Sequence, residues 1–342
     1  MMIRLLLAIF LMASLQLSCQ TTTQVRQSGF HTIAFYNVEN LFDTIDDART
    51  LDEDFLPGAR VAWNTQRYND KLHNIARVIA TMDTLDFPHI IGLAEVENRA
   101  VLDDLVRQPL IQKAGYQIMH FEDDDPRGIE VALLYRDSYF KALKSGTIEF
   151  QDSVPERHIL YASLVNAMAD TLHLYVNHWR SRRGVQETSA PVRKAAGRAL
   201  RQSIDQLKSA NPQAKIVVMG DFNDNPNDES IAIELQALPL DEAERIPSAL
   251  VNLAAEPFAN GQGTLYFNNW DFFDQMMVSQ SLITSRSLRL SSFLIISRPW
   301  MLYTDSRGIQ RPNRTMSGNR YFGGYSDHLP VMLRLDRVIQ QH

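Results

Sequence analysis

Short apolar runs alternate with stretches of helical spacing along most of the chain. The runs are short and rich in β-branched residues, which is typical of buried strands, and they cover 30–36, 87–93, 130–136, 216–219, 270–279 and 329–335. Residues 68–82 and 191–209 instead repeat apolar side chains on one helix face. Strands followed by helices predict an α/β fold.

The remaining segments are less regular. Residues 157–165 and 171–176 predict two paired strands with a turn between them, and Asn98 is placed to cap a helix that follows it. Residues 228–253 are acidic and indicate a helix, and 256–269 indicate a loop. Residues 297–325 predict a long irregular loop in which five arginines are interleaved with aromatic side chains.

Polar residues stand at the point where several of the apolar runs begin or end. They are Asn37, Glu95, His178, Asp221 with Asn223, and Asp327 with His328. Each alone fits a turn or a helix cap, but their recurrence favours one site at the rim of a sheet. Their oxygen ligands indicate Mg²⁺, with Mn²⁺ or Ca²⁺ as alternatives, rather than zinc.

The composition is that of a folded globular protein with a large core. The 342 residues are 45% hydrophobic and 22% charged, and the formal net charge is −6. A protein that binds nucleic acid through its overall charge is usually basic, so a phosphate partner must be met by a local patch. No obligate protein partner is evident. One cysteine excludes an internal disulfide within the chain.

The N-terminal segment predicts export from the cytoplasm. Residues 1–18 combine an early arginine, an apolar run over 5–15 and a small residue before Cys19, as in a signal peptide. The sequence around Cys19 resembles a bacterial lipoprotein cleavage box, which implies a lipidated Cys19, a polar tether over 19–29 and one domain over 30–342. We expect an extracytoplasmic membrane lipoprotein, secreted if Cys19 is not lipidated.

Five motifs in order carry a resemblance over about 30–335. They are FYNVENLFD, GLAEVEN, NHWRSRRG, VVMGDFNDNP and YSDHLPV. Together they resemble the endonuclease/exonuclease/phosphatase superfamily, to which pancreatic-type deoxyribonuclease belongs. The resemblance implies a four-layer α/β sandwich, two central mixed sheets flanked by helices, and hydrolysis of phosphoesters by activated water.

The resemblance also implies a role for each motif residue. Asn37 and Glu95 resemble the family's metal-site residues, with Asp327 completing or approaching that site. His178 resembles the histidine that contacts the scissile phosphate or acts as an acid. Asp221 resembles the carboxylate that orients or deprotonates the attacking water.

Further residues follow from the same motifs. Asn223 resembles a phosphate-binding neighbour of the attacking-water carboxylate. His328 resembles the second histidine, and Asp274 the aspartate that fixes its tautomer and raises its pKa. Glu130 is expected to serve His178 in the same way. Substrate contacts are expected from three arginines, Arg157, Arg180 and Arg182.

Three classes of function remain open at this stage. An extracytoplasmic nuclease, acting as an endonuclease or exonuclease, is favoured by the motifs and by the arginine and aromatic segment. A phospholipid phosphodiesterase like sphingomyelinase, or a phosphomonoesterase, would use the same site, with 293–296 as the candidate for a membrane-facing apolar hairpin. A surface binding protein without activity is disfavoured by the full set of carboxylates and histidines.

Overall fold

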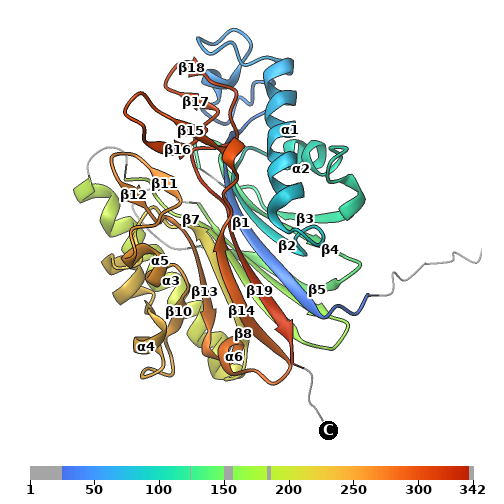
Figure 1. The fold of residues 1–342 in the computed structure, drawn as a ribbon, viewed down its shortest axis with the longest axis vertical. Coiled ribbons are helices and arrows are strands. Elements are labelled where there is room, and N and C mark those ends of the chain that lie inside the picture. Colours follow the sequence, from blue (N-terminus) through green and yellow to red (C-terminus); the bar gives the residue numbers. More distant parts are fainter. Residues whose placement is uncertain (1–24, 124, 150–156, 183–185, 339–342) are drawn as a thin grey trace, which may run out of the picture.

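The computed structural model describes residues 25–338 except 124, 150–156 and 183–185 (Figure 1). The expected signal peptide, Cys19 and most of the tether lie outside the described residues. Two large mixed sheets form the centre of the domain. The first has the strand order β14-β19-β1-β2-β4-β3, and the second has the order β5-β6-β7-β8-β13-β10-β9.

The strands of the first sheet are β1 (Phe30–Leu41), β2 (Ile90–Val96), β3 (Tyr116–His120), β4 (Glu130–Arg136), β14 (Leu288–Ile295) and β19 (Val331–Arg337). The strands of the second are β5 (Phe140–Ile148), β6 (Ile159–Asn166), β7 (Thr171–His178), β8 (Lys215–Asp221), β9 (Ala237–Leu238), β10 (Leu250–Asn252) and β13 (Asp274–Ser279). Strands β1 and β2 are parallel, and so are β7 and β8. In each sheet, the carboxyl ends of these two neighbouring strands therefore lie side by side.

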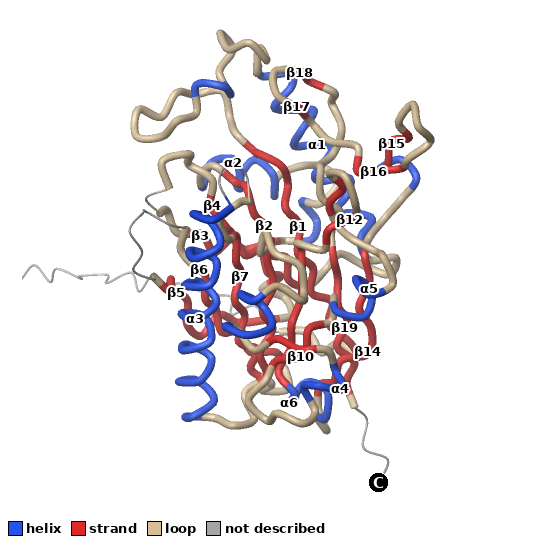
Figure 2. The backbone as a smooth tube through the Cα atoms, turned by 90° about the vertical axis from the view of Figure 1, so that its left-hand side faces the viewer, coloured by secondary structure: helices blue, strands red, loops and turns tan. Residues whose placement is uncertain are grey.

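Helices cover the outer faces of both sheets. Apolar clusters fill the space between the two sheets and the space between each sheet and its helices. Helices α1 (Thr65–Met82) and α2 (Arg99–Val106) pack on the first sheet, and α3 (Gln186–Ala210) packs on the second (Figure 2). The inner faces of the two sheets share one core that includes Phe35, Leu133, Val176 and Met219. The predicted four-layer sandwich is therefore confirmed.

The described fold also has three short α-helices, three small hairpins, a π-helix η3 (Ser230–Glu234) and three 3₁₀ helices, η1 (Glu53–Phe55), η2 (Gln112–Ala114) and η4 (Pro299–Met301). The short α-helices are α4 (Leu240–Ala243), α5 (Ala255–Ala259) and α6 (Gln280–Thr284). The hairpins are β11 (Leu265–Tyr266) with β12 (Trp270–Asp271), β15 (Leu302–Thr304) with β16 (Gln310–Pro312), and β17 (Met316–Ser317) with β18 (Arg320–Tyr321). The predicted loops over 256–269 and 297–325 therefore contain short regular elements.

Two sequence expectations need correction. Residues 228–253 do not form one helix: they contain a π-helical turn over Ser230–Glu234 and the short α4, while Pro239 and Pro247 interrupt the segment and other apolar residues extend the second sheet as β9 and β10. Residues 293–296 form no membrane-facing hairpin: Phe293 to Ile295 belong to β14 and pair with β19. Among the described residues, no helix is both long and apolar enough to span a bilayer.

Candidate active site

Three candidate residues lie in one row across the second sheet. His178 at the end of β7 is in register with Asp221 at the end of β8, and Asp221 is in register with Asp274 at the start of β13. Directly opposite residues project to the same face of a sheet, so the three side chains share one face. Gly220 permits this spacing, since a Cβ there would lie 2.5 Å from the carbonyl oxygen of Asn177.

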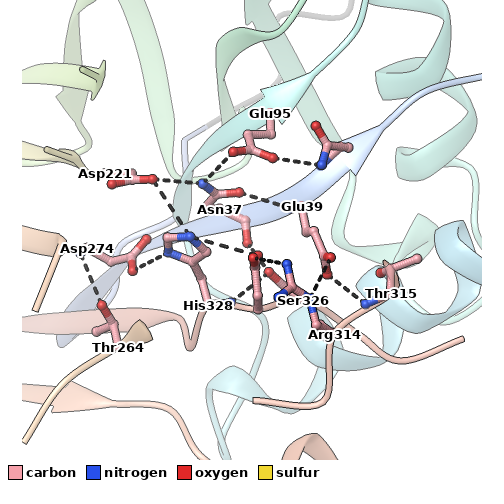
Figure 3. Close-up of polar contacts among 12 residues, drawn as sticks. Asn37, Glu39, Glu95, Asp221, Thr264, Asp274, Arg314, Thr315, Ser326 and His328 are labelled. Atoms are coloured by element: carbon pink, nitrogen blue, oxygen red, sulfur yellow. Dashed lines mark hydrogen bonds and ion pairs between the residues drawn. The ribbon is translucent and has the colours of Figure 1, made fainter. Parts of the chain in front are cut away.

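The first sheet brings Asn37 and Glu95 to the same row. The Asn37 side-chain amide donates to Oδ2 of Asp221 at 2.9 Å and to Oε1 of Glu95 at 3.3 Å (Figure 3). Strand β1 does not end at Asn37, as the sequence had suggested, but continues to Leu41 through an irregularity. Asn40 there has φ +53°, and its backbone N–H donates to Oε2 of Glu95 at 2.9 Å.

Asp221 stands at the centre of this arrangement. Its Oδ1 accepts the backbone N–H of Asn223 at 2.9 Å, while Oδ2 faces Asn37. Burial raises the pKa of Asp221 to about 7, with Asp274 and Glu95 adding to the rise and His328 opposing it. A carboxyl group with that pKa can take and release a proton near neutral pH.

His328 is held as a cation by its neighbours. Its Nδ1 lies 2.7 Å from Oδ2 of Asp274, and its Nε2 lies 3.9 Å from Oδ2 of Asp221. Burial alone would lower the pKa of His328, but the charges of Asp274 and Asp221 together with the hydrogen bond to Asp274 raise it well above the usual value. The predicted pairing of Asp274 with His328 is present in the structure.

His178 has a different electrostatic environment. Its Nε2 lies 3.6 Å from Oδ2 of Asp221 and 3.8 Å from Oε1 of Glu95. Burial lowers the pKa of His178 well below 6.5, and the charge of Arg157 adds to that effect. The two histidines of the site are therefore neutral and charged respectively, although each faces Asp221.

The expected contact between Glu130 and His178 is wrong. Glu130 begins β4, where it lies opposite Val96, and its carboxylate contacts Nε2 of His120 on β3. Nδ1 of His178 is buried and has no hydrogen-bond partner within the part of the chain that the structure describes. The error arises because the start of β4 directs its side chain toward its own sheet neighbour rather than toward β7.

Asp327 lies at the border of the cluster. Its Oδ2 pairs with Arg314 at 2.7 Å, and its Oδ1 lies 3.8 Å from Nε2 of His328. Arg314 also approaches Oε1 of Glu39, whose carboxylate accepts the backbone N–H groups of Thr315 and Met316 at 2.6 and 3.1 Å. Sequence reasoning missed Glu39 and Arg314, although both lie in segments that it had singled out.

The predicted substrate-binding arginines are already engaged with protein groups. Arg157 pairs with Asp125 at 2.6 Å and donates to the backbone carbonyls of His178 and Trp179. Arg182 pairs with Asp224 at 2.7 Å and with Asp228. These two guanidinium groups therefore stabilise the loops that follow β7 and β8.

The last two predicted residues lie beside the same loops. The Asn223 side chain donates to the carbonyl of Trp179 at 3.1 Å, and the carbonyl of Arg180 accepts from Arg193 at 3.2 Å. Asn223 has φ +50°, a conformation that asparagine tolerates better than most residues. The Asn223 amide thus fixes the loop after β7 against the loop after β8, next to Asp221.

The donor set fits a divalent cation. One ligand atom each from Glu95, His178 and Asp221 lie within 4.8 Å of one another, and so do atoms from Asp221, Asp274 and His328. In the second group His328 is committed to Asp274, whereas in the first group the carboxylates of Glu95 and Asp221 stand close together, both contacted by the Asn37 amide and both facing Nε2 of His178. Carboxylate and amide oxygens suit Mg²⁺, Mn²⁺ or Ca²⁺.

Comparison with solved structures shows the same fold at low sequence identity. Humanized zebrafish (D. rerio) TDP2 matches with a TM-score of 0.57 and 18% identity, covering 90% of this chain and 100% of that one. The human Nocturnin catalytic domain with bound sulfate gives 0.56 and 18%, covering 92% and 96%. A mannosyl-6-phosphatase of Bacteroides thetaiotaomicron gives 0.56 and 15%, covering 89% and 99%.

Sequence comparison assigns the family. No curated protein sequence matches the chain. The profile of the Endonuclease/Exonuclease/phosphatase family matches residues 32–337, which span both sheets and every residue of the cluster around Asp221. The chain therefore belongs to the endonuclease/exonuclease/phosphatase family of metal-dependent phosphoesterases.

Proposed function

We propose that this protein is an extracytoplasmic, Mg²⁺-dependent nuclease that hydrolyses phosphodiester bonds with an activated water. The observation that carries the proposal is the position of Asp221 between a neutral histidine, His178, and a cationic one, His328. Hydrolysis of a phosphodiester requires a proton acceptor for water and positive charge for the phosphate oxygens, and this row supplies both.

Asn37 and Glu95 would hold the cation, with Asp327 at the border of its site. When bound, the cation supplies positive charge that neutralises the phosphate oxygens. Asp221 accepts the proton of the attacking water, because its pKa of about 7 matches neutral conditions. His328, fixed by Asp274, presents a positive Nε2, and His178 presents its ring to the other side of Asp221.

The proposal of nucleic acid as substrate rests on the segment before Asp327. Residues 297–325 carry five arginines and one aspartate, a local excess of positive charge in a chain with net charge −6. Zebrafish TDP2, which shares the fold with a TM-score of 0.55, has been solved with a single-stranded DNA product. A basic, aromatic segment beside a phosphoesterase site is suited to a nucleic acid backbone and its bases.

A phosphomonoesterase is the second candidate. The mannosyl-6-phosphatase of B. thetaiotaomicron shares the fold over 99% of its length, and the row around Asp221 contains nothing that requires a diester. A phospholipid substrate is less favoured, because the apolar residues once expected to form a hairpin are part of β14.

Hydrolysis assays test the proposal. Purified protein lacking residues 1–19 is incubated with duplex DNA, single-stranded DNA, RNA, bis-p-nitrophenyl phosphate and p-nitrophenyl phosphate, with Mg²⁺ or with EDTA. We expect cleavage of nucleic acid that requires Mg²⁺ and falls by about 10²- to 10⁴-fold in D221N and H178A. Hydrolysis of the monoester alone would instead establish the phosphatase.

The cellular location needs its own test. Full-length protein and a C19A variant are expressed in a bacterium, and membrane, periplasmic and cytosolic fractions are probed. Lipidation predicts wild-type protein in the membrane fraction and release of C19A from it. Wild-type protein found in the cytosol would contradict the proposed location without affecting the assigned chemistry.

A further inference from the structure

One small hairpin lies directly beside His328, and a second hairpin packs against the first. Leu265 of β11 forms a β-bridge with His328, and the backbone N–H of Leu329 donates to the carbonyl of Thr264 at 2.8 Å. Strand β11 also packs against β16, so the β11–β12 hairpin and the β15–β16 hairpin stand side by side (Figures 1 and 2). Whatever occupies the site therefore meets these hairpins on the His328 side.

Side chains of the two hairpins form a continuous stack. The rings of Trp270 and Tyr266 lie 5.5 Å apart and nearly perpendicular. The guanidinium carbon of Arg311 lies 5.7 Å from the Tyr266 ring centre and 5.6 Å from the Tyr303 ring centre, so Arg311 joins the two hairpins. We call Trp270, Tyr266, Arg311 and Tyr303 the hairpin stack.

Two aromatic rings of these hairpins are exposed, one within the hairpin stack and one outside it. Tyr303 is 49% exposed, and Phe267 at the turn between β11 and β12 is 76% exposed. An aromatic ring in water gains by burying its face, and each ring here is held by a short, paired hairpin rather than by a long loop. The exposed faces are therefore available to a flat, apolar part of a ligand.

Charge distinguishes this side of the site from the opposite one. Where β2 ends and β4 begins, a pocket is lined mainly by carboxylates, among them Glu97, Asp123, Asp125 and Glu130, with Arg49 also on its wall. Phosphates of a long strand would be repelled there more than at residues 297–325, which carry five arginines against one aspartate, with Arg307 and Arg311 paired to Asp305 and Arg314 paired to Asp327. A strand bound at the site is thus directed over the hairpins.

We propose that the hairpin stack is a platform for the nucleobase next to the scissile phosphate, which makes single-stranded nucleic acid the preferred substrate. This inference rests on the proposed nuclease function. Bases in a duplex are stacked on each other and paired, so their faces cannot reach Tyr303 or Phe267. An unpaired base stacks on an aromatic ring regardless of its identity.

The test compares three substrates with four variants of the same protein. Y303A and F267A remove exposed rings, Y303F keeps the ring, and L143A removes an equally exposed apolar side chain from β5. Values of kcat and KM are measured on a single-stranded oligonucleotide, the same sequence as duplex, and bis-p-nitrophenyl phosphate. We expect Y303A and F267A to raise KM for the single strand by roughly 10-fold and to leave kcat and KM for the small diester unchanged. Y303F and L143A should leave kcat and KM unchanged for all three substrates.

An oligonucleotide lacking the base next to the cleaved bond supplies an independent readout. For wild type, kcat/KM on this oligonucleotide is expected to be roughly 10-fold lower than on the intact single strand. For Y303A, kcat/KM is expected to be the same on both oligonucleotides. Equal losses on duplex and single strand, or unchanged kinetics in both alanine variants, would overturn the platform while leaving the nuclease function in place. A wild-type protein that cleaves the small diester but no nucleic acid would refute the nuclease function itself.

Discussion

Nδ1 of His328 and Oδ2 of Asp274 lie 2.7 Å apart, with both side chains buried. The charge of Asp274 helps to hold the pKa of His328 well above its usual value. In D274N the imidazolium of His328 loses that stabilisation, so its pKa falls and it loses its proton at a lower pH than in wild type. We expect kcat/KM to fall by about 10²-fold at pH 8 and by less at pH 6, which a pH-rate profile measures.

A matched control for this prediction is D170N. Asp170 is also a buried carboxylate in an ion pair, with Lys215 at 2.8 Å, but it lies at the opposite end of β7 and β8. Its replacement should lower stability and leave the pH-rate profile unchanged. A D274N enzyme with the wild-type profile would show that Asp274 does not control the charge of His328.

Metal binding is expected to depend on Glu95. Its Oε1 lies close to Asn37 and His178, in the group of side chains that includes Asp221. E95Q keeps the shape of the side chain but removes its charge. Losing an outer-shell partner typically lowers metal affinity about 10- to 100-fold, so Mg²⁺ affinity should fall by at least that factor. Without metal, E95Q should melt at a higher temperature than wild type, because two close carboxylates repel each other.

Calorimetric titration with Mg²⁺ and thermal melting in EDTA measure both effects. Glu97 provides the control, because its carboxylate accepts the backbone N–H of Asp43 at 2.7 Å and does not belong to the group around Asp221. E97Q should bind Mg²⁺ as wild type does. Wild-type affinity in E95Q would exclude Glu95 from the metal site.

Much of the fold could be predicted from the sequence, because its central strands are buried on both faces. Strands β4 and β8 read as continuous apolar runs, and Asn98 caps α2 by accepting the backbone N–H of Val101, as predicted. Strands β3, β5 and β14 were not predicted, and all three lie at a sheet edge. Strand β5 exposes side chains along most of its length, so no apolar run marks it, whereas the apolar end of β14 was interpreted as part of a hairpin.

The site could be predicted in part for a similar reason. Polar residues that follow apolar runs, such as His178 and Asp221, were located directly, while the partnership of Asp274 with His328 came from the family resemblance. The contacts of Glu39 with Arg314 and Thr315 could not be predicted, because they join β1 to a segment far along the chain. No periodic pattern records such a contact.

That unpredicted contact includes a buried lysine. Nζ of Lys71 on α1 donates to Oγ1 of Thr315 at 2.5 Å and to the carbonyl of Tyr325 at 2.9 Å. Burial raises the pKa of Glu39 to about 7 and lowers that of Lys71 to about 8, and each charge partly offsets the other's shift. K71M leaves Glu39 without this compensation, so we expect the free energy of unfolding to fall by about 3–5 kcal/mol.

Chemical denaturation of K71M, E39Q and the double variant measures the coupling. E39Q removes the carboxylate charge that Lys71 compensates, so the double variant should lose less stability than the sum of the two single variants. K144M, on the exposed face of β5, should change stability by less than about 0.5 kcal/mol. Additive losses in the double variant would show that Lys71 and Glu39 act independently.

A pair of buried histidines should make stability depend on pH. The rings of His31 and His89 lie 5.1 Å apart and perpendicular, and burial lowers their pKa values to about 4 and about 3. The unfolded chain binds protons at both histidines near pH 6.5, whereas the folded chain does not. The stability they contribute is therefore complete above pH 6.5 and is lost as pH falls toward 4, by up to about 1.4 kcal/mol per pH unit for each histidine.

Denaturation at pH 7, 6, 5 and 4 measures this slope in wild type and in H89N. An asparagine can still accept the backbone N–H of Thr32, which donates to Nδ1 of His89 at 3.2 Å, but it does not titrate. H89N should therefore lose stability more slowly with falling pH, by about one proton's worth of slope. As the control, H73N replaces an exposed histidine on α1 and should keep the wild-type slope. A wild-type slope in H89N as well would mean that His89 is already protonated in the folded protein.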